Sequence, residues 1–297
     1  MTHADMDDHE AGIHYLERCV AVSRHDESHL RKAYALLASS LEQCGRVDDA
    51  YETCHRGLAV FPHDPELLFR SGVLAHNRGY LQVAESAYLE AIQPRDRDNF
   101  SSIDPGIASY KTRHNLGLVY EAMRRADLAE VQWRSSTVDH SQFAPSRQAM
   151  IERLIQQRRF QTAQVEVEEM LGDSELRCHG LILEGVLEET QGNIEKAKRR
   201  LEDVVKEFPA RDDPRQALCR LLFDGGPMSE AETAIQELLR RSPKDAAAYH
   251  HLGVVFVRQG KLDEAIDAFQ RSLELRPNAT MTKESLDAAL STRERTE

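Results

Sequence analysis

The stretch AAAYHHLGVVFVRQGKLDEAIDAFQRSLELRPNA, residues 246–279, decides the fold. Its apolar residues recur three or four positions apart in two runs, so each run predicts a helix with one apolar stripe. Gly260 separates the runs and predicts the end of the first helix, and Pro277 predicts the end of the second. Small residues at Gly253 and Ala265 allow the two helices to pack closely. The stretch therefore predicts a helix–turn–helix unit, which needs neighbours to bury its apolar face.

The same unit recurs along the chain. Counting back from Ala265 in steps of 34 residues, with one surplus of 11 residues, reaches six further alanines: Ala231, Ala197, Ala163, Ala129, Ala84 and Ala50. Four glycines share the phase of Gly260: Gly45, Gly79, Gly192 and Gly226. The phase predicts seven repeats, at 31–64, 65–98, 110–143, 144–177, 178–211, 212–245 and 246–279. Two repeats thus occupy 31–98 and five occupy 110–279, with an inserted loop, NFSSIDPGIAS, at 99–109.

This pattern resembles the tetratricopeptide repeat (TPR) in residue type and in spacing, through Tyr249, Leu252, Gly253, Phe256, Gly260, Ala265, Phe269 and Pro277. The resemblance implies an all-α, right-handed superhelical solenoid of seven 34-residue helix–turn–helix repeats. Residues 1–30 predict an N-terminal half-repeat, and residues 280–297 predict a C-terminal capping helix, because the ends of such an array must be closed by a polar face.

The N-terminal half-repeat is a second helix without the first. In EAGIHYLERCV, residues 10–20, the spacing of Ala11, Tyr15 and Cys19 matches that of Ala265, Phe269 and Leu273, so we expect the first three to be buried. Two interpretations stay open: the helix caps the array, or the chain is the tail of a longer protein.

Composition limits the function. The net charge of −12 argues against nucleic-acid binding, which normally needs a basic face. No apolar run approaches 18 residues, so we expect no membrane span, and the acidic start MTHADMDDHE excludes a secretory signal. Five cysteines include no CxxC pair, and Cys54 and Cys219 take apolar packing positions. We interpret them as reduced core thiols of a cytoplasmic protein.

Catalytic chemistry is absent from the sequence pattern. Asp96-Arg97-Asp98 is a DxD triplet, the metal–nucleotide motif of many glycosyltransferases, but it closes a repeat rather than a strand. A cluster of metal-ligating types near the start sits in a segment that we expect to be frayed: His3, Asp7, Asp8, His9 and His14. No nucleophile elbow, phosphate loop or zinc spacing is present. We expect a protein that is not an enzyme and binds neither a cofactor nor a metal.

A narrower resemblance covers the first half of the chain. The run FSSIDPGIASYKTRHNL, Phe100 to Leu116, resembles the TPR region that follows the catalytic domain in some bacterial family-2 glycosyltransferases, as do RKAYALL at 31–37 and PELLF at 65–69. The catalytic domain itself is absent, because no alternating strand–helix pattern occurs in the 297 residues.

The TPR resemblance places a ligand groove on the first helix of each repeat, at positions two, five, nine, twelve and thirteen. These positions, with position six, include Lys32, Ser39, Phe69, Arg70, His76, Lys111, His114, Asn115, Gln148, Arg220, His250 and Arg258. Acidic residues share the groove: Glu42, Glu121, Glu152, Glu189 and Asp224. The groove lacks the Lys/Asn/Arg set with which chaperone-binding TPRs hold a C-terminal carboxylate. It also lacks the asparagine ladder of the O-linked N-acetylglucosamine transferase.

The densest candidate site directly follows the insertion, at Lys111, Arg113, His114 and Asn115. Several donors within five residues suit an acidic peptide or a carboxylate. The alternative interpretation is that Arg113 and Asn115 tie the loop to the array.

We expect a non-catalytic scaffold or adaptor that binds a protein or peptide partner in the groove. The alternative function is an accessory or detached C-terminal module of a bacterial family-2 glycosyltransferase, which positions the acceptor or dimerises the enzyme. A homodimer of the present chain is therefore also considered.

Overall fold

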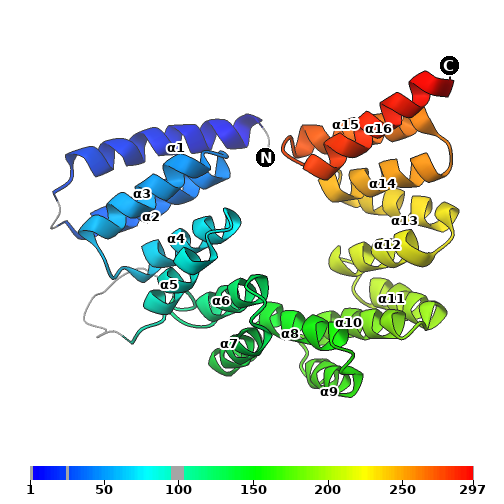
Figure 1. Cartoon of the computed structure of the whole chain (residues 1–297), viewed down its shortest axis with the longest axis horizontal. Coiled ribbons are helices and arrows are strands. Elements are labelled where there is room, and N and C mark those ends of the chain that lie inside the picture. The colour runs from blue at the N-terminus through cyan, green and yellow to red at the C-terminus, as the bar shows by residue number, and fades with distance from the viewer. Residues whose placement is uncertain (1–2, 25–26, 95–103, 297) are drawn as a thin grey trace. The chain divides into compact units, whose positions relative to one another are not determined.

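The computed structural model describes residues 3–24, 27–94 and 104–296, and every regular element within these ranges is a helix (Figure 1). The helices are α1 (His3–Val22), α2 (Ser28–Gln43), α3 (Val47–Val60), α4 (Pro65–Asn77), α5 (Leu81–Ala91), α6 (Tyr110–Ala122), α7 (Ala126–Asp139), α8 (Ala144–Gln156), α9 (Phe160–Leu171), α10 (Arg177–Thr190), α11 (Ile194–Glu207), α12 (Asp213–Gly225), α13 (Met228–Arg241), α14 (Ala246–Arg258), α15 (Leu262–Leu275) and α16 (Thr280–Thr296). The all-α prediction is confirmed. Two compact units divide the chain inside α8, at residues 1–150 and 151–297.

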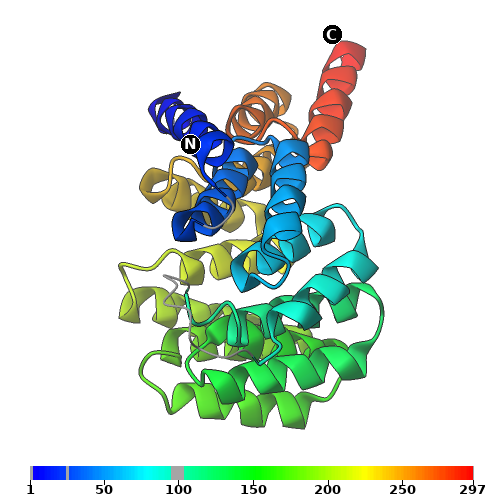
Figure 2. The same cartoon turned by 90° about the vertical axis from the view of Figure 1, so that its left-hand side faces the viewer.

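Helices alternate between two roles within each unit. The even-numbered helices from α2 to α14 begin the predicted repeats and are called A helices; the odd-numbered helices from α3 to α15 are called B helices. An A helix packs on the following B helix, as in α4 with α5 and α14 with α15, and a B helix packs on the next A helix. Successive A helices also touch, as in α2 with α4 and α10 with α12. Figures 1 and 2 show these helix pairs lying side by side.

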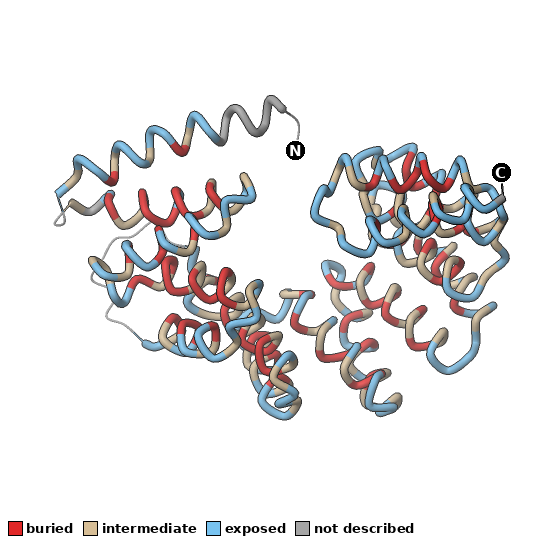
Figure 3. The backbone as a smooth tube through the Cα atoms, turned by 45° about the horizontal axis from the view of Figure 1, so that its top comes forward, coloured by how far each residue is buried: buried red, intermediate tan, exposed pale blue. Residues whose placement is uncertain are grey.

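The alanines that set the 34-residue phase lie at the centre of the helix contacts. Each of the seven has no exposed surface: Ala50, Ala84, Ala129, Ala163, Ala197, Ala231 and Ala265. In Figure 3 the buried residues follow one side of the helices in both units. A methyl group is the largest side chain that these positions hold, so the alanine period in the sequence reports the closest approach of the helices.

The A helices begin at polar caps where the sequence supplies them. The Asp64 side chain accepts a hydrogen bond from the Leu67 amide at 2.9 Å, and Pro65 occupies the first helical turn of α4. The Asp245 side chain accepts one from the Ala248 amide at 3.0 Å. Each aspartate satisfies one of the amides that a helix start leaves without an intrahelical partner.

The A helices end in a left-handed residue at the phase of Gly260. Gly45, Gly79, Gly192 and Gly260 all have positive φ there. Two repeats carry arginine instead, and Arg124 and Arg158 adopt φ of 60° and 58°. This conformation costs a residue with a Cβ about 1–2 kcal/mol.

The prediction that Gly226 ends its helix in the same way is wrong. Its φ is −94° and its ψ is 174°, which is extended backbone. Pro227 follows directly, and a proline forces the residue before it out of the helical region. The proline therefore decides this turn.

Glycine on an A helix admits an aromatic ring from the paired B helix. A Cβ at Gly253 would lie 2.6 Å from the Phe269 ring. Gly72 faces Tyr88 and Gly117 faces Trp133 in the same way. In each case the glycine stands at position eight of its repeat and the ring at position twenty-four.

The N-terminal helix packs through a face other than the expected one. Tyr15 is 70% exposed and Ala11 is exposed, whereas Ile13 and Val20 are buried in the α1–α2 contact. The prediction that Ala11 and Tyr15 are buried is therefore wrong. In a complete repeat these positions pack on the A helix of the same repeat, and the chain holds only two residues before α1. Cys19 is half-buried at the edge of the core.

The C-terminal helix α16 closes the second unit. Ala289 is buried, and Leu286 and Leu290 pack against the core of α12 to α15. Thr282 is also buried, and its hydroxyl contacts His250 at 3.1 Å. The remaining residues of the helix are largely exposed.

The cysteine prediction is confirmed for the fold: all five are free thiols, and Cys54 and Cys219 are buried in the core. Within the described ranges, no helix is both long enough and apolar enough to span a bilayer.

Candidate interaction surface

In the first unit the groove cations predicted from the sequence join neighbouring A helices. Lys32 on α2 donates to both carboxylate oxygens of Glu66 on α4 at 2.8 Å, and Glu66 is only 7% exposed. Arg70 on α4 lies 3.9 Å from Glu42 on α2. The two pairs run in opposite directions between the same two helices, so they hold α2 against α4.

Two further groove residues on α4 are half-buried. The Phe69 ring packs on the Tyr88 ring with centroids 6.0 Å apart. Burial lowers the pKa of His76, so this imidazole is neutral at pH 7. Phe69 and His76 therefore offer apolar and neutral polar surface.

The segment after the insertion is held by its own side chains. Lys111 donates to Asp104, and Asp104 also accepts from the Gly106 amide at 2.9 Å. The pKa of Asp104 is lowered by the bond from Lys111 and then by that amide. Gly106 is required here because a Cβ would meet the Tyr110 ring.

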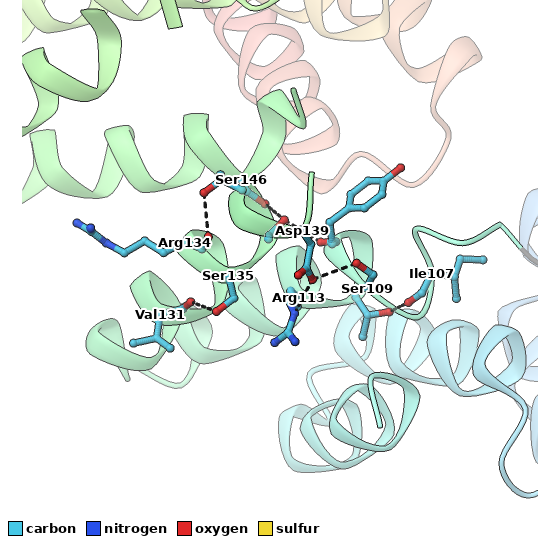
Figure 4. Close-up of polar contacts among 12 residues, drawn as sticks. Ile107, Ser109, Arg113, Val131, Arg134, Ser135, Asp139 and Ser146 are labelled. Carbon is cyan, nitrogen blue, oxygen red and sulfur yellow. Dashed lines mark hydrogen bonds and ion pairs between the residues drawn. The ribbon is translucent and has the colours of Figure 1, made fainter. Parts of the chain in front are cut away.

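Arg113 lies on the other side of the same segment. Its Nε donates to Asp139 at 2.8 Å, and Ser109 Oγ donates to the same carboxylate oxygen at 3.0 Å (Figure 4). Asp139 ends α7, so the pair ties the entrance of α6 to its own B helix. For Arg113 the geometry matches the interpretation in which the residue anchors the loop.

His114 ends a buried chain of hydrogen bonds. Ser136 donates to the Tyr110 carbonyl at 2.9 Å and accepts from Ser146 at 2.7 Å. The single proton of Ser146 is then in use, so its oxygen accepts from Nδ1–H of His114 at 3.2 Å. Burial lowers the pKa of His114 to about 4. His114 is therefore a neutral imidazole with its proton on Nδ1.

This histidine–serine contact has the wrong polarity for nucleophilic catalysis. An activated serine must donate its proton to the imidazole. Ser146 donates to Ser136 instead and is fully buried. The arrangement joins α6, α7 and the start of α8 and provides no nucleophile.

Asn115 lies beside the hydroxyl of Tyr88 on α5. Burial raises the pKa of Tyr88, and the Asn115 side chain partly offsets that shift. Asn115 is itself only half-exposed. Lys111, Arg113, His114 and Asn115 are thus adjacent in sequence but point to four different partners, so they do not converge on one ligand position.

In the second unit Arg220 lies in a pocket of about 370 Å³. Its wall comes from the ends of α10 and α12 and the start of α11: Val186, Glu189, Thr190, Ile194, Arg220, Leu221, Asp224 and Gly225. Arg220 donates to both oxygens of Glu189, at 2.8 and 3.5 Å, and lies 3.8 Å from Asp224. Three of the groove positions predicted from the sequence therefore meet here.

The remaining two candidates lie on α14. His250 contacts Thr282 on α16, and its ring packs 5.6 Å from Phe269; burial and then the adjacent His251 lower its pKa. Arg258 lies over the Phe223 ring at 4.8 Å and donates to the Phe223 carbonyl at 3.1 Å. Both residues connect successive repeats.

The sequence reasoning identified these positions but missed their partners, of which Glu66, Ser146 and Thr282 are examples. A signal was available: each partner lies one repeat further on, at 34 residues for Lys32 and at 32 residues for His114 and His250. No group of three metal-ligating side chains occurs in the ranges that the structure describes. The DxD triplet and the side chains of His3 to His9 lie outside the described residues.

Family models for the tetratricopeptide repeat match residues 31–74 and 217–280. The chain contains tetratricopeptide repeats. The two matched segments include Lys32, Phe69 and Arg70 in the first unit and Arg220, His250 and Arg258 in the second. No curated protein matches the chain significantly.

Solved TPR structures share the fold. A tetratricopeptide repeat protein from Parabacteroides merdae is 17% identical with a TM-score of 0.60, over 88% of this chain and 98% of that one. The APC/C Cut9–Hcn1 hetero-tetramer gives 16% identity and a TM-score of 0.50, over 95% of this chain and 47% of its own. Human IFIT1, a dimer with PPP-AAAA, gives 17% and 0.50, over 82% and 55%. At these identities the likeness concerns the fold alone.

Proposed function

We propose that this TPR chain is a non-catalytic scaffold that binds a partner polypeptide along its A helices. The observation that carries the proposal is the pocket between α10 and α12, two A helices in direct contact. It combines a concave opening, three apolar side chains and polar groups, which is the composition of a site that receives a side chain. The repeat fold supports the same reading, because such arrays present extended binding surfaces.

The surface around the pocket favours a transient partner. The inter-helix ion pairs are partly exposed, and exposed pairs contribute about 1 kcal/mol or less each. They can therefore rearrange around an incoming chain without unfolding the repeats. The net charge of −12 favours a protein partner over nucleic acid.

The test blocks the pocket with bulk. Thr190 is exposed at the pocket wall and bonds back to the Val186 carbonyl, so Thr190→Trp should fill the opening without breaking a packed contact. Thr233 on α13 is a matched control: it is also exposed and bonds back to the Ser229 carbonyl, but it lies outside the pocket. Partners cross-linked to the chain in its source cells are quantified by mass spectrometry for the two variants.

We expect Thr190→Trp to lose at least one partner that Thr233→Trp retains, with the melting temperatures of both variants within a few degrees of the unchanged chain. Equal cross-linking by the two folded variants would contradict binding at this pocket. The same cells provide the test of a cytoplasmic location, by fractionation.

The alternative, a module associated with a bacterial family-2 glycosyltransferase, rests on the sequence of residues 100–116. Four residues of that run, Asp104, Gly106, Tyr110 and Lys111, contact one another in one turn, so the resemblance has a structural explanation. The alternative predicts that a glycosyltransferase is recovered in the same cross-linking experiment, or that the native polypeptide is far larger than 33.7 kDa. We expect neither. Dimerisation is tested separately, by light scattering of the purified chain.

A further inference from the structure

The pocket on α10, α11 and α12 has an uneven charge balance that selects its occupant. Its three charged side chains are two carboxylates and one guanidinium, so the wall carries one excess negative charge. We propose that it receives a lysine or arginine side chain of the partner polypeptide. This inference rests on the proposed function and specifies the chemistry of the residue bound.

The two carboxylates of the pocket are not equally engaged. Arg220 donates to both oxygens of Glu189, and the Glu189 side chain is 18% exposed. Asp224 is only 3.8 Å from Arg220, at the edge of ion-pair distance, and its side chain is 53% exposed. His251 also faces Asp224 but is held neutral, because burial lowers its pKa more than nearby carboxylates raise it. Asp224 is therefore the carboxylate with capacity for a new cation.

An anionic side chain is disfavoured in the same place. To reach Arg220 it would have to replace Glu189, and the displaced carboxylate would remain beside it in a partly buried position. Like charges within about 4–6 Å repel, and partial burial strengthens the repulsion. The saturated guanidinium thus excludes the carboxylate ligand that the cations of the groove first suggest.

The apolar part of the pocket suits the stem of a long basic side chain. Val186, Ile194 and Leu221 line it, and Leu221 is only 1% exposed in the free chain. Lysine and arginine bury their methylene stems on apolar surface while the charged end stays in a polar, hydrated position. A cation entering along these side chains would bring its charge to Asp224 at the pocket wall.

The experiment uses the full chain and arrayed decapeptides of neutral random sequence, in which one central position is lysine, arginine, norleucine or glutamate. Norleucine keeps the apolar stem of lysine without its charge. Binding is measured at low salt and at 0.5 M salt for the unchanged chain and for Asp224→Asn. The control is Asp203→Asn on α11, which also removes one exposed carboxylate but lies outside the pocket wall.

We expect lysine and arginine peptides to bind at least about fivefold more tightly than norleucine peptides. This preference should disappear in Asp224→Asn and at 0.5 M salt, and persist in Asp203→Asn. Asp224 is exposed and weakly paired, so its replacement should leave the fold intact, which melting temperature checks.

Two contrary results are distinguishable. If norleucine or glutamate peptides bind best, and Thr190→Trp abolishes that binding, the pocket is a peptide site but the proposed cation is wrong. If no peptide binds and Thr190→Trp retains every cross-linked partner, the proposed function fails with it. A lysine preference that Asp203→Asn removes equally would reflect only the net charge of the chain, and would overturn the inference.

Discussion

Single residues in this chain act through their size and backbone conformation. The in-phase alanines are fully buried, and the glycines at position eight face aromatic rings. Small residues thereby set the distance between helices, while polar residues join one repeat to the next. Each of the next two predictions tests one residue type.

Gly253→Ala should destabilise the second unit. The added Cβ would lie 2.6 Å from the Phe269 ring, which is 1% exposed and has no room to move aside. Overpacking of this kind costs about 1–3 kcal/mol, measured as a lower urea midpoint. Gly12→Ala is the control: nothing lies within 4 Å of its Cβ, and alanine favours the helix by up to about 1 kcal/mol. Equal effects of the two changes would refute the packing argument.

Arg124→Gly and Arg158→Gly should each stabilise the chain. Both arginines have φ near +60°, and glycine removes that strain of about 1–2 kcal/mol while adding about 0.4–1 kcal/mol of unfolded-state entropy. We expect a net gain of roughly 0.5–1 kcal/mol in urea unfolding. Gly192→Ala, at φ +84°, is the reverse change and should destabilise. A loss of stability on placing glycine at 124 or 158 would mean that these arginines contribute more than strain.

At the scale of the element, helices are joined by short polar contacts between equivalent repeat positions. His114 and His250 both stand at position five and both contact a hydroxyl 32 residues further on. Each links an A helix to the start of the next one. The consequence is that the two contacts depend on a neutral imidazole ring, because a buried charge is penalised.

Stability should fall below pH 6.5 in part because of His114. Its pKa is about 4 in the folded chain, below the ordinary 6.5, so the unfolded chain binds more protons between these values. Stability is therefore full above pH 6.5 and is progressively lost as the pH falls towards 4. His114→Asn keeps a donor at the place of Nδ1 and cannot titrate, so its urea midpoint should change less across this range. An unchanged pH profile would contradict the role given to His114.

The sequence was sufficient for whatever depends on side-chain size and periodicity. It located the helices of each repeat because a fully buried alanine is recorded directly in the chain. It failed for Tyr15, since burial there needs a helix that these residues do not include. It also gave no partner for Arg113 or Arg220, because Asp139 and Glu189 become neighbours only when the helices pack.

For the whole molecule, the cysteines report on each unit separately. Cys54 lies in the first unit and Cys178 and Cys219 in the second, and all three are buried. Burial raises the pKa of Cys54 and of Cys219 to about 12 and that of Cys178 to about 11, so the reactive thiolate is scarce. Cys19 and Cys44 are half-buried near the core of the first unit.

N-Ethylmaleimide at pH 7 should modify Cys19 and Cys44 in the native chain and the other three only in urea. Peptide mapping by mass spectrometry gives the extent at each site against urea concentration. Because repeats contact only near neighbours, we expect Cys178 and Cys219 to become reactive together. Rapid modification of Cys54 in the absence of urea would contradict the packing of α3 described above.

Trp133 is the sole tryptophan of the chain, and it is 2% exposed, with its Nε1 donating to the His114 carbonyl at 3.2 Å. Its fluorescence therefore originates entirely within residues 1–150. An unfolding curve recorded by tryptophan emission would follow that unit and remain blind to loss of structure in residues 151–297. Circular dichroism would record both units, since helices occupy each. A mismatch between the two optical signals would thus be an intrinsic readout of which half opens first.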